Sequence, residues 1–266
     1  MTKDSSKNDL LNPLPISKNT GDALFKPAAT SIGEASKTLL DGVFHLAFDP
    51  IRKFNIQREA YLERFKIEVQ TSVQTIPEKY QDDSKIGLVL KSIEDSKYQL
   101  NSDELRAMFT RLITVTLDSR ANSSISPKFS AIISEMSPRE ARLLEMIYYN
   151  TASLVPFVRL KAENKSTYSS KKLGNGFLLL DDHSENSMSL ELSLLESANL
   201  ITFHEDTRLI HSHFADIFTE FRSFFPEDLN TFLPDISDEE ELVFEHSYYS
   251  LTELGESFCK IVFKSM

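Results

Sequence analysis

The 266-residue sequence has no tryptophan, one cysteine and seven glycines, and it contains no long apolar run. A single cysteine excludes an intramolecular disulfide, and the apolar surroundings of Cys259 predict a small core residue. The scarcity of glycine disfavours glycine-rich phosphate-binding loops and favours helices, whose interiors exclude glycine. Because no stretch approaches about 18 consecutive apolar residues, we do not expect a conventional transmembrane helix.

Charge is spread unevenly along the chain, whose formal net charge is −11. Residues 1–80 carry a net charge of +1 and residues 81–180 a net charge of +3. Residues 181–266 carry four Lys and Arg against 19 Asp and Glu, which is a net charge of −15. Proteins that bind DNA or RNA hold the phosphates with clustered cations, so direct nucleic-acid binding by this part of the chain is not expected.

Residues 1–22 are polar, and Pro13 and Pro15 interrupt any helix, which predicts a disordered leader. This leader lacks the apolar centre and cleavage site of a secretory signal. Together with the lone cysteine, this predicts a cytoplasmic protein, with peripheral contact at the inner face of the membrane as the alternative.

Residues 23–150 have the periodicity of a helical domain. We expect Asn101 to cap a helix, with Glu104 three residues later, and Ser137, Pro138 and Glu140 to form a capping box. Apolar residues at helical spacing predict helices over 27–48, 55–76, 86–98, 101–117, 127–135 and 138–150.

Residues 151–266 predict a winged-helix-like α+β domain with a small sheet. We expect a strand at 155–160, a polar loop at 161–172 and a turn at Gly174-Asn175-Gly176. A helix and strand over 190–204, joined by a left-handed cap at Asn199, precede a strand at 242–246 and a helix at 251–263. The order helix, strand, strand, helix is typical of a wing, here interrupted by an acidic, phenylalanine-bearing insertion at 207–241. The expected fold class is therefore mainly α.

Several separated phrases resemble the abortive-infection alpha family of bacteria, and together they span most of the chain. The phrases lie at Pro27–Arg52, Asp103–Ile113, Asp118-Ser119-Arg120, Pro127–Ile133 and Leu251–Phe258. The resemblance implies a bacterial protein tied to phage resistance, in which infected cells stop supporting phage growth. It implies no catalytic residues and no cofactor.

Four residues could in principle hold a divalent metal ion, namely His204, His211, His213 and Asp216. Their spacing is looser than that of structural metal sites, so we favour a solvated strand end and helix start and expect no metal. Chance pairs abound among 40 acidic residues, so no nuclease or hydrolase centre can be assigned. Lys161, Lys165, Lys171 and Lys172 with Tyr168 form a locally basic segment, which we interpret as a solvated loop.

The segment 27–48 predicts an amphipathic helix whose apolar side includes Ile32, Leu39, Leu40, Val43 and Phe44. Small residues along it would permit close packing on another helix or burial at a membrane surface. Its polar side is not basic, so attraction to anionic lipid should be weak, and packing is the favoured interpretation.

The acidic run Asp235, Asp238, Glu239, Glu240 and Glu241 is the candidate contact surface for a basic, phage-encoded or other protein partner. The leading hypothesis is a non-enzymatic phage-defence factor that acts through protein–protein contact. Its rivals are a membrane-acting effector that uses residues 27–48, a hidden nuclease or hydrolase, and a DNA-binding regulator. The sequence leaves the oligomeric state open.

Overall fold

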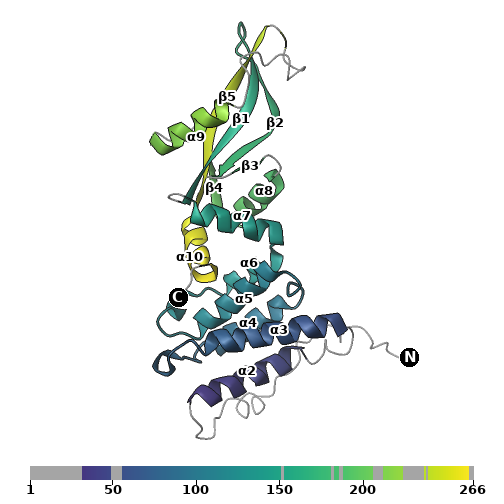
Figure 1. Cartoon of the computed structure of the whole chain (residues 1–266), viewed down its shortest axis with the longest axis vertical. Coiled ribbons are helices and arrows are strands. Elements are labelled where there is room, and N and C mark those ends of the chain that lie inside the picture. Colours follow the sequence, from purple (N-terminus) through teal and green to yellow (C-terminus); the bar gives the residue numbers. More distant parts are fainter. Residues whose placement is uncertain are drawn as a thin grey trace, which may run out of the picture.

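A computed structural model of the chain describes residues 32–48, 56–150, 153–180, 183–185, 188–205, 212–223, 237 and 239–263. Helices gather at one end and an antiparallel sheet extends from the other, as Figure 1 shows. The predicted leader at 1–22 and most of the predicted insertion at 207–241 lie outside the described residues. A mainly helical chain with a small sheet agrees with the fold class expected from the sequence.

Among the described residues, six α-helices form the helical end. They are α2 (Ile32–Phe48), α3 (Ile56–Val73), α4 (Ile86–Ser96), α5 (Asp103–Thr116), α6 (Lys128–Glu135) and α7 (Pro138–Tyr149). In the stretch that the structure covers, no helix is both long and apolar enough to cross a membrane.

The helix caps agree with the sequence in one case and differ in another. Ser137 and Glu140 form the predicted capping box at the start of α7. The prediction for α5 was wrong by one residue, because Ser102 rather than Asn101 is its N-cap and accepts a hydrogen bond from the amide of Leu105. Ser102 can do this because its backbone is extended while Asp103 already lies in the helix.

The sheet has the strand order β3-β2-β1-β5-β4, and neighbouring strands run antiparallel. The strands are β1 (Leu154–Asn164), β2 (Ser170–Leu180), β3 (His183–Glu185), β4 (Ile201–His204) and β5 (Glu240–Leu251). Where the structure describes this region, the strands are accompanied by the helices α8 (Ser189–Ser197), α9 (Ser212–Ser223) and α10 (Glu253–Val262). The predicted helix before the strand, the left-handed Asn199 (φ 59°), the returning strand and the last helix are all present.

The predicted loop at 161–172 and turn at 174–176 were wrong. β1 continues to Asn164, β2 begins at Ser170, and the hairpin turns between them. Gly174 and Gly176 instead lie within β2, beside a register shift opposite Val158 and Leu160. Both glycines have positive φ, and a Cβ on Gly176 would lie 2.3 Å from the ring of Phe157, so glycine is needed for a bulge.

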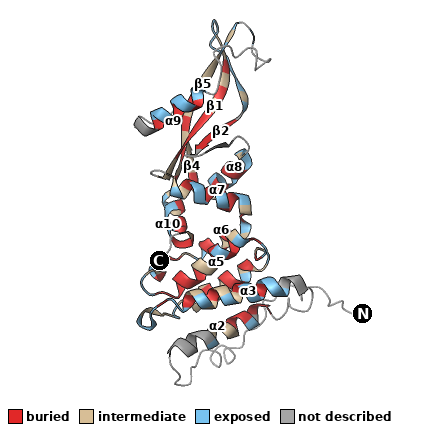
Figure 2. Cartoon of the chain, viewed as in Figure 1, coloured by how far each residue is buried: buried red, intermediate tan, exposed pale blue. Residues whose placement is uncertain are grey.

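The two faces of the sheet differ beyond its junction with the helices. One face carries a cluster of apolar side chains from β1, β2 and β5, and α9 covers it with Phe214, Phe218 and Phe221. Residues on alternate positions point to the opposite face, which is polar in this outer part. Figure 2 shows buried residues in the part of the sheet beside α9 and more exposed residues toward the tip.

Helix α10 joins the sheet to the helical end. Its ring of Phe258 packs edge-on against Phe129 of α6, at 5.5 Å between centroids. One hydrophobic core accordingly runs from Leu40 to Val262. The division into domains at 150 is not tested by this core and stays a prediction.

Candidate functional site

The face of β1 and β5 that points away from α9 carries charged side chains of both signs. The strand register places Arg159 opposite Glu245 and Glu163 opposite Glu241, with Lys161 opposite Val243 between them. Residues directly opposite in an antiparallel pair point to the same face. We call this surface, together with Ser170 of β2, the sheet groove.

Glu245 is the most buried charge of the sheet groove, with a side chain only 5% exposed. It accepts hydrogen bonds from the ammonium of Lys161 and, at 3.4 Å, from the guanidinium of Arg159. Arg159 also pairs with Glu205 at 3.1 Å and stacks over the rings of Phe157 and Phe203. A buried carboxylate needs such partners, so this cluster holds β1, β5 and the end of β4 together.

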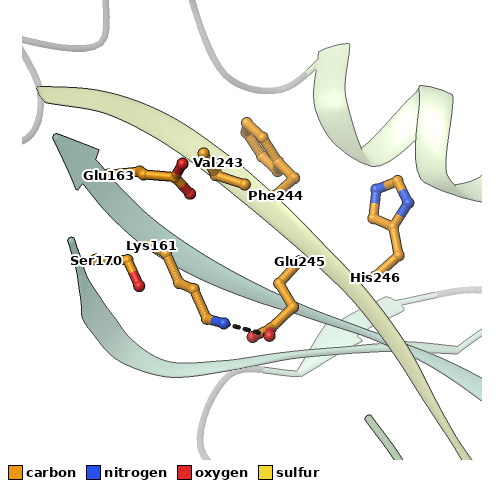
Figure 3. A pocket seen from close by; sticks show the side chains of 7 residues that line it. All are labelled: Lys161, Glu163, Ser170, Val243, Phe244, Glu245 and His246. Atoms are coloured by element: carbon orange, nitrogen blue, oxygen red, sulfur yellow. Dashed lines mark hydrogen bonds and ion pairs between the residues drawn. The ribbon is translucent and has the colours of Figure 1, made fainter. Parts of the chain in front are cut away.

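A pocket of about 350 Å³ lies in the sheet groove. It is lined by Lys161, Glu163, Ser170, Val243, Phe244, Glu245 and His246. Figure 3 shows Lys161 and Glu245 joined at one side of the pocket, with Glu163 and Val243 near each other at another. Phe244 and His246 point to the other face of β5, where their rings meet Phe221 and Phe218 of α9.

The described residues of the acidic run predicted as a contact surface are Glu239, Glu240 and Glu241, and β5 begins at Glu240. Asp235 and Asp238 lie outside the described residues, whereas Glu239 and Glu241 are exposed at the tip of the sheet. Glu240 pairs with Lys171 at 3.3 Å. A hydrogen bond from the backbone amide of Ser237 lowers the pKa of the Glu240 carboxyl, and the neighbouring Lys171 lowers it further.

The basic segment and the acidic run are therefore neighbours. The segment that we interpreted as a solvated loop, Lys161 to Lys172, forms β1, β2 and their turn, and the acidic run pairs with it as β5. Lys161 and Lys171 are joined to glutamates of β5, and the amide of Lys165 donates to the carbonyl of Glu239. The charges of Lys161 and Lys171 are thus compensated within the sheet.

The metal candidates are separated or fall outside the described part. The ring of His204 lies 2.9 Å from the hydroxyl of Ser250 and stacks on Tyr248, and Asp216 is exposed on α9. His211 and the side chain of His213 are not described. Within the described ranges, no three His, Cys, Asp or Glu side chains are placed to hold a metal ion.

The apolar side of α2 faces the helical core. Leu40, Val43 and Phe44 are 1%, 6% and 3% exposed, and Leu39 is half-buried against the same core. The Phe44 ring lies 5.7 Å from that of Phe65 on α3. The side chain of Ile32 is not described.

The sequence predicted a strand for some residues of the sheet groove and a loop for others. Glu245 lay in the strand predicted over residues 242–246. Arg159 was also predicted in a strand. Glu163 and Ser170 were assigned to a loop, so nothing in the sequence brought them to the same surface.

A model of the family described as abortive infection alpha matches residues 57–262, well over half of the chain. This range begins after α2, so the similar phrase at Pro27–Arg52 lies outside it. A comparison with curated proteins found no match. A solved structure of an uncharacterized protein from the hydrocarbon-degrading marine bacterium Alcanivorax borkumensis SK2 is 15% identical. The match covers 51% of this chain and 92% of that one, and its TM-score of 0.25 supports no conclusion about the fold.

Proposed function

The chain belongs to the abortive infection alpha family, and from that premise we propose that it is a non-enzymatic phage-defence factor acting through contact with another protein. Membership links the chain to abortive infection, and the mode of action is the part that we propose. The contact surface in this proposal is the sheet groove together with the acidic start of β5.

The observation that carries the proposal is the difference between the two faces of the projecting sheet. Helix α9 covers the apolar face with Phe214, Phe218 and Phe221. The other face keeps Glu163 partly accessible at a pocket and Glu241 exposed directly opposite it, with Glu239 exposed just before β5. A polar surface with a defined hollow and uneven charge is typical of a transient protein interface, in which electrostatic complementarity selects the partner.

A winged-helix-like arrangement is part of this proposal. Helix α8, strands β4 and β5 and helix α10 follow in the order of that module, and β4 pairs antiparallel with β5. In this interpretation α8 takes the place of a recognition helix. Its nine residues contain two glutamates and no lysine or arginine, which disfavours docking against phosphate and supports a protein partner.

Burial of Leu40, Val43 and Phe44 makes the membrane-acting alternative less favourable. Exposing these side chains to lipid would require α2 to leave α3 and α4 and uncover their apolar surfaces. Helix α2 is also held by Asp41, which forms an ion pair with Lys66 and accepts a hydrogen bond from the side-chain amide of Gln70, both at 2.8 Å. Contact with a protein needs no such rearrangement.

The test is phage protection in a bacterium that expresses the full chain. We expect fewer plaques than in cells with an empty vector. The double variant Glu239→Gln with Glu241→Gln should lose protection, whereas Asp216→Asn with Glu220→Gln, which removes the same charge from the exposed side of α9, should retain it.

Two results would count against the proposal. If cells with the wild-type chain gave as many plaques as cells with the empty vector, the proposed role in phage defence would be wrong. Equal protection by the two double variants would remove the acidic tip from the mechanism. Affinity purification of the tagged chain from infected cells should recover a basic protein with the wild type and with the α9 variant, but not with the tip variant.

A further inference from the structure

The pocket in the sheet groove contains polar groups that the fold leaves unused. Glu163 of β1 lies directly opposite Ser170 of β2, and both line the pocket. Among the described residues, neither side chain has a hydrogen bond or ion pair. A half-buried carboxylate and a neighbouring hydroxyl therefore present acceptor oxygens to the pocket.

The wall beside these acceptors is apolar. Val243 of β5 is half-buried and lines the pocket between Glu245 and the strand end. Side chains that combine an aliphatic stem with a charged head can lay the stem along such a surface and keep the head among polar groups. Lysine and arginine have this composition.

The charge of the pocket favours a cation. The ammonium of Lys161 is already held by Glu245, so these two charges compensate each other. Glu163 remains, and Glu241 lies directly opposite it on β5. Like charges at opposed positions of a sheet repel each other, and a bound cation would relieve that repulsion.

Building on the protein contact proposed above, we propose that this pocket binds a lysine or arginine side chain of the partner. The cationic head lies between Glu163 and Ser170, and its stem packs along Val243. The pair of Lys161 and Glu245 closes the inner end and restricts how deeply the side chain can enter. The partner is thereby selected by a projecting cationic residue rather than by overall charge.

The experiment measures binding of a fluorescein-labelled hexa-arginine peptide to the purified full chain by fluorescence anisotropy. A hexa-citrulline peptide of the same length is the neutral control. Glu163→Gln removes the pocket charge, and Glu220→Gln makes the same change on the exposed side of α9. Circular dichroism checks that both variants fold like the wild type.

We expect Glu163→Gln to weaken binding of the arginine peptide about tenfold, as loss of a hydrogen bond to a charged group does, and Glu220→Gln to change it less than about twofold. Citrulline peptide should not bind. Equal affinity of the two variants for the arginine peptide, or no binding of this peptide to the wild type, would contradict the proposal that the pocket binds a cationic side chain. Plaque protection by wild type is measured in parallel, so the defence role can fail or stand independently of this result.

Discussion

Replacing Gly255 by alanine tests how α10 is fixed to the sheet. Gly255 lies in the first turn of α10, and a Cβ there would lie 2.0 Å from the carbonyl oxygen of Leu200 and 2.9 Å from its carbonyl carbon. Leu200 precedes β4, so the contact is with backbone that cannot rotate away. Thr252, the N-cap of α10, also donates to the carbonyl of Asn199 at 2.6 Å.

Two opposing effects set the magnitude. Alanine is a better helix former than glycine by about 1 kcal/mol. Forcing an extra carbon into a packed site costs about 1 to 3 kcal/mol, and the rigid backbone contact places Gly255→Ala at the upper end of that range. We therefore expect the free energy of unfolding to fall by about 2 kcal/mol.

The assay is urea unfolding followed by circular dichroism, with Gly87→Ala as the matched control. Gly87 is in the first turn of α4, and its Cβ would meet no atom within 4 Å. This control should gain up to about 1 kcal/mol. If Gly255→Ala proves as stable as Gly87→Ala, the close approach of α10 to Leu200 is wrong.

Three further predictions concern buried groups. Phe44 packs between Phe48 and Phe65, so Phe44→Ala should lower the free energy of unfolding, measured in urea, by about 3 to 5 kcal/mol. For the same reason the wild-type protein should not float with anionic liposomes, and flotation would favour a membrane role. Arg120 lowers the pKa of the fully buried Asp118 carboxyl, so this ion pair stabilises the fold above the unfolded pKa of about 4 and the gain is lost as the pH falls through the folded value. Asp118→Asn should therefore be less stable than wild type at neutral pH and lose less stability on acidification. Urea unfolding of both proteins at neutral and acidic pH measures this, and an equal loss of unfolding free energy in the two proteins would contradict it. Burial raises the pKa of Tyr249 to about 12, so the stabilising effect of its neutral phenol is present below its ordinary pKa and lost as the pH rises through about 12. When the ultraviolet titration curve of Tyr249→Phe is subtracted from that of wild type, the difference should show a step near pH 12 and none near pH 10.

Local sequence rules predicted much of the helical end because the decisive contacts there are local. Ser137 and Glu140 satisfy each other's backbone within four residues. The same holds between α8 and β4, where Asn199 adopts the left-handed conformation that its side chain tolerates. The phrase from Leu251 to Phe258 supported the family resemblance. The structure explains two of its residues, because Thr252 caps α10 and Gly255 permits its approach to Leu200.

The outer sheet could not be predicted in the same way because long-range pairing forms it. Lys161 to Lys172 is polar, with few of the residues that favour strands, yet Lys161 is held by Glu245 and Lys171 by Glu240, more than 60 positions away. Gly174 and Gly176 indicated a turn, and only the register beside Phe157 shows that they form a bulge. The pocket combines three strands, so its composition followed from this pairing rather than from any motif.

Site-specific photo-crosslinking at Lys172 tests most directly whether the sheet groove contacts a protein. Lys172 is exposed and lies opposite Lys161, which lines the pocket, so a photoreactive residue there lies beside a bound partner and leaves Glu163 and Ser170 intact. In phage-infected cells we expect a crosslink to one protein, at a peptide containing lysine or arginine, which disappears when Glu163→Gln is added and persists with Glu220→Gln. Crosslinks to nucleic acid or lipid, or a protein crosslink unaffected by Glu163→Gln, would contradict the account.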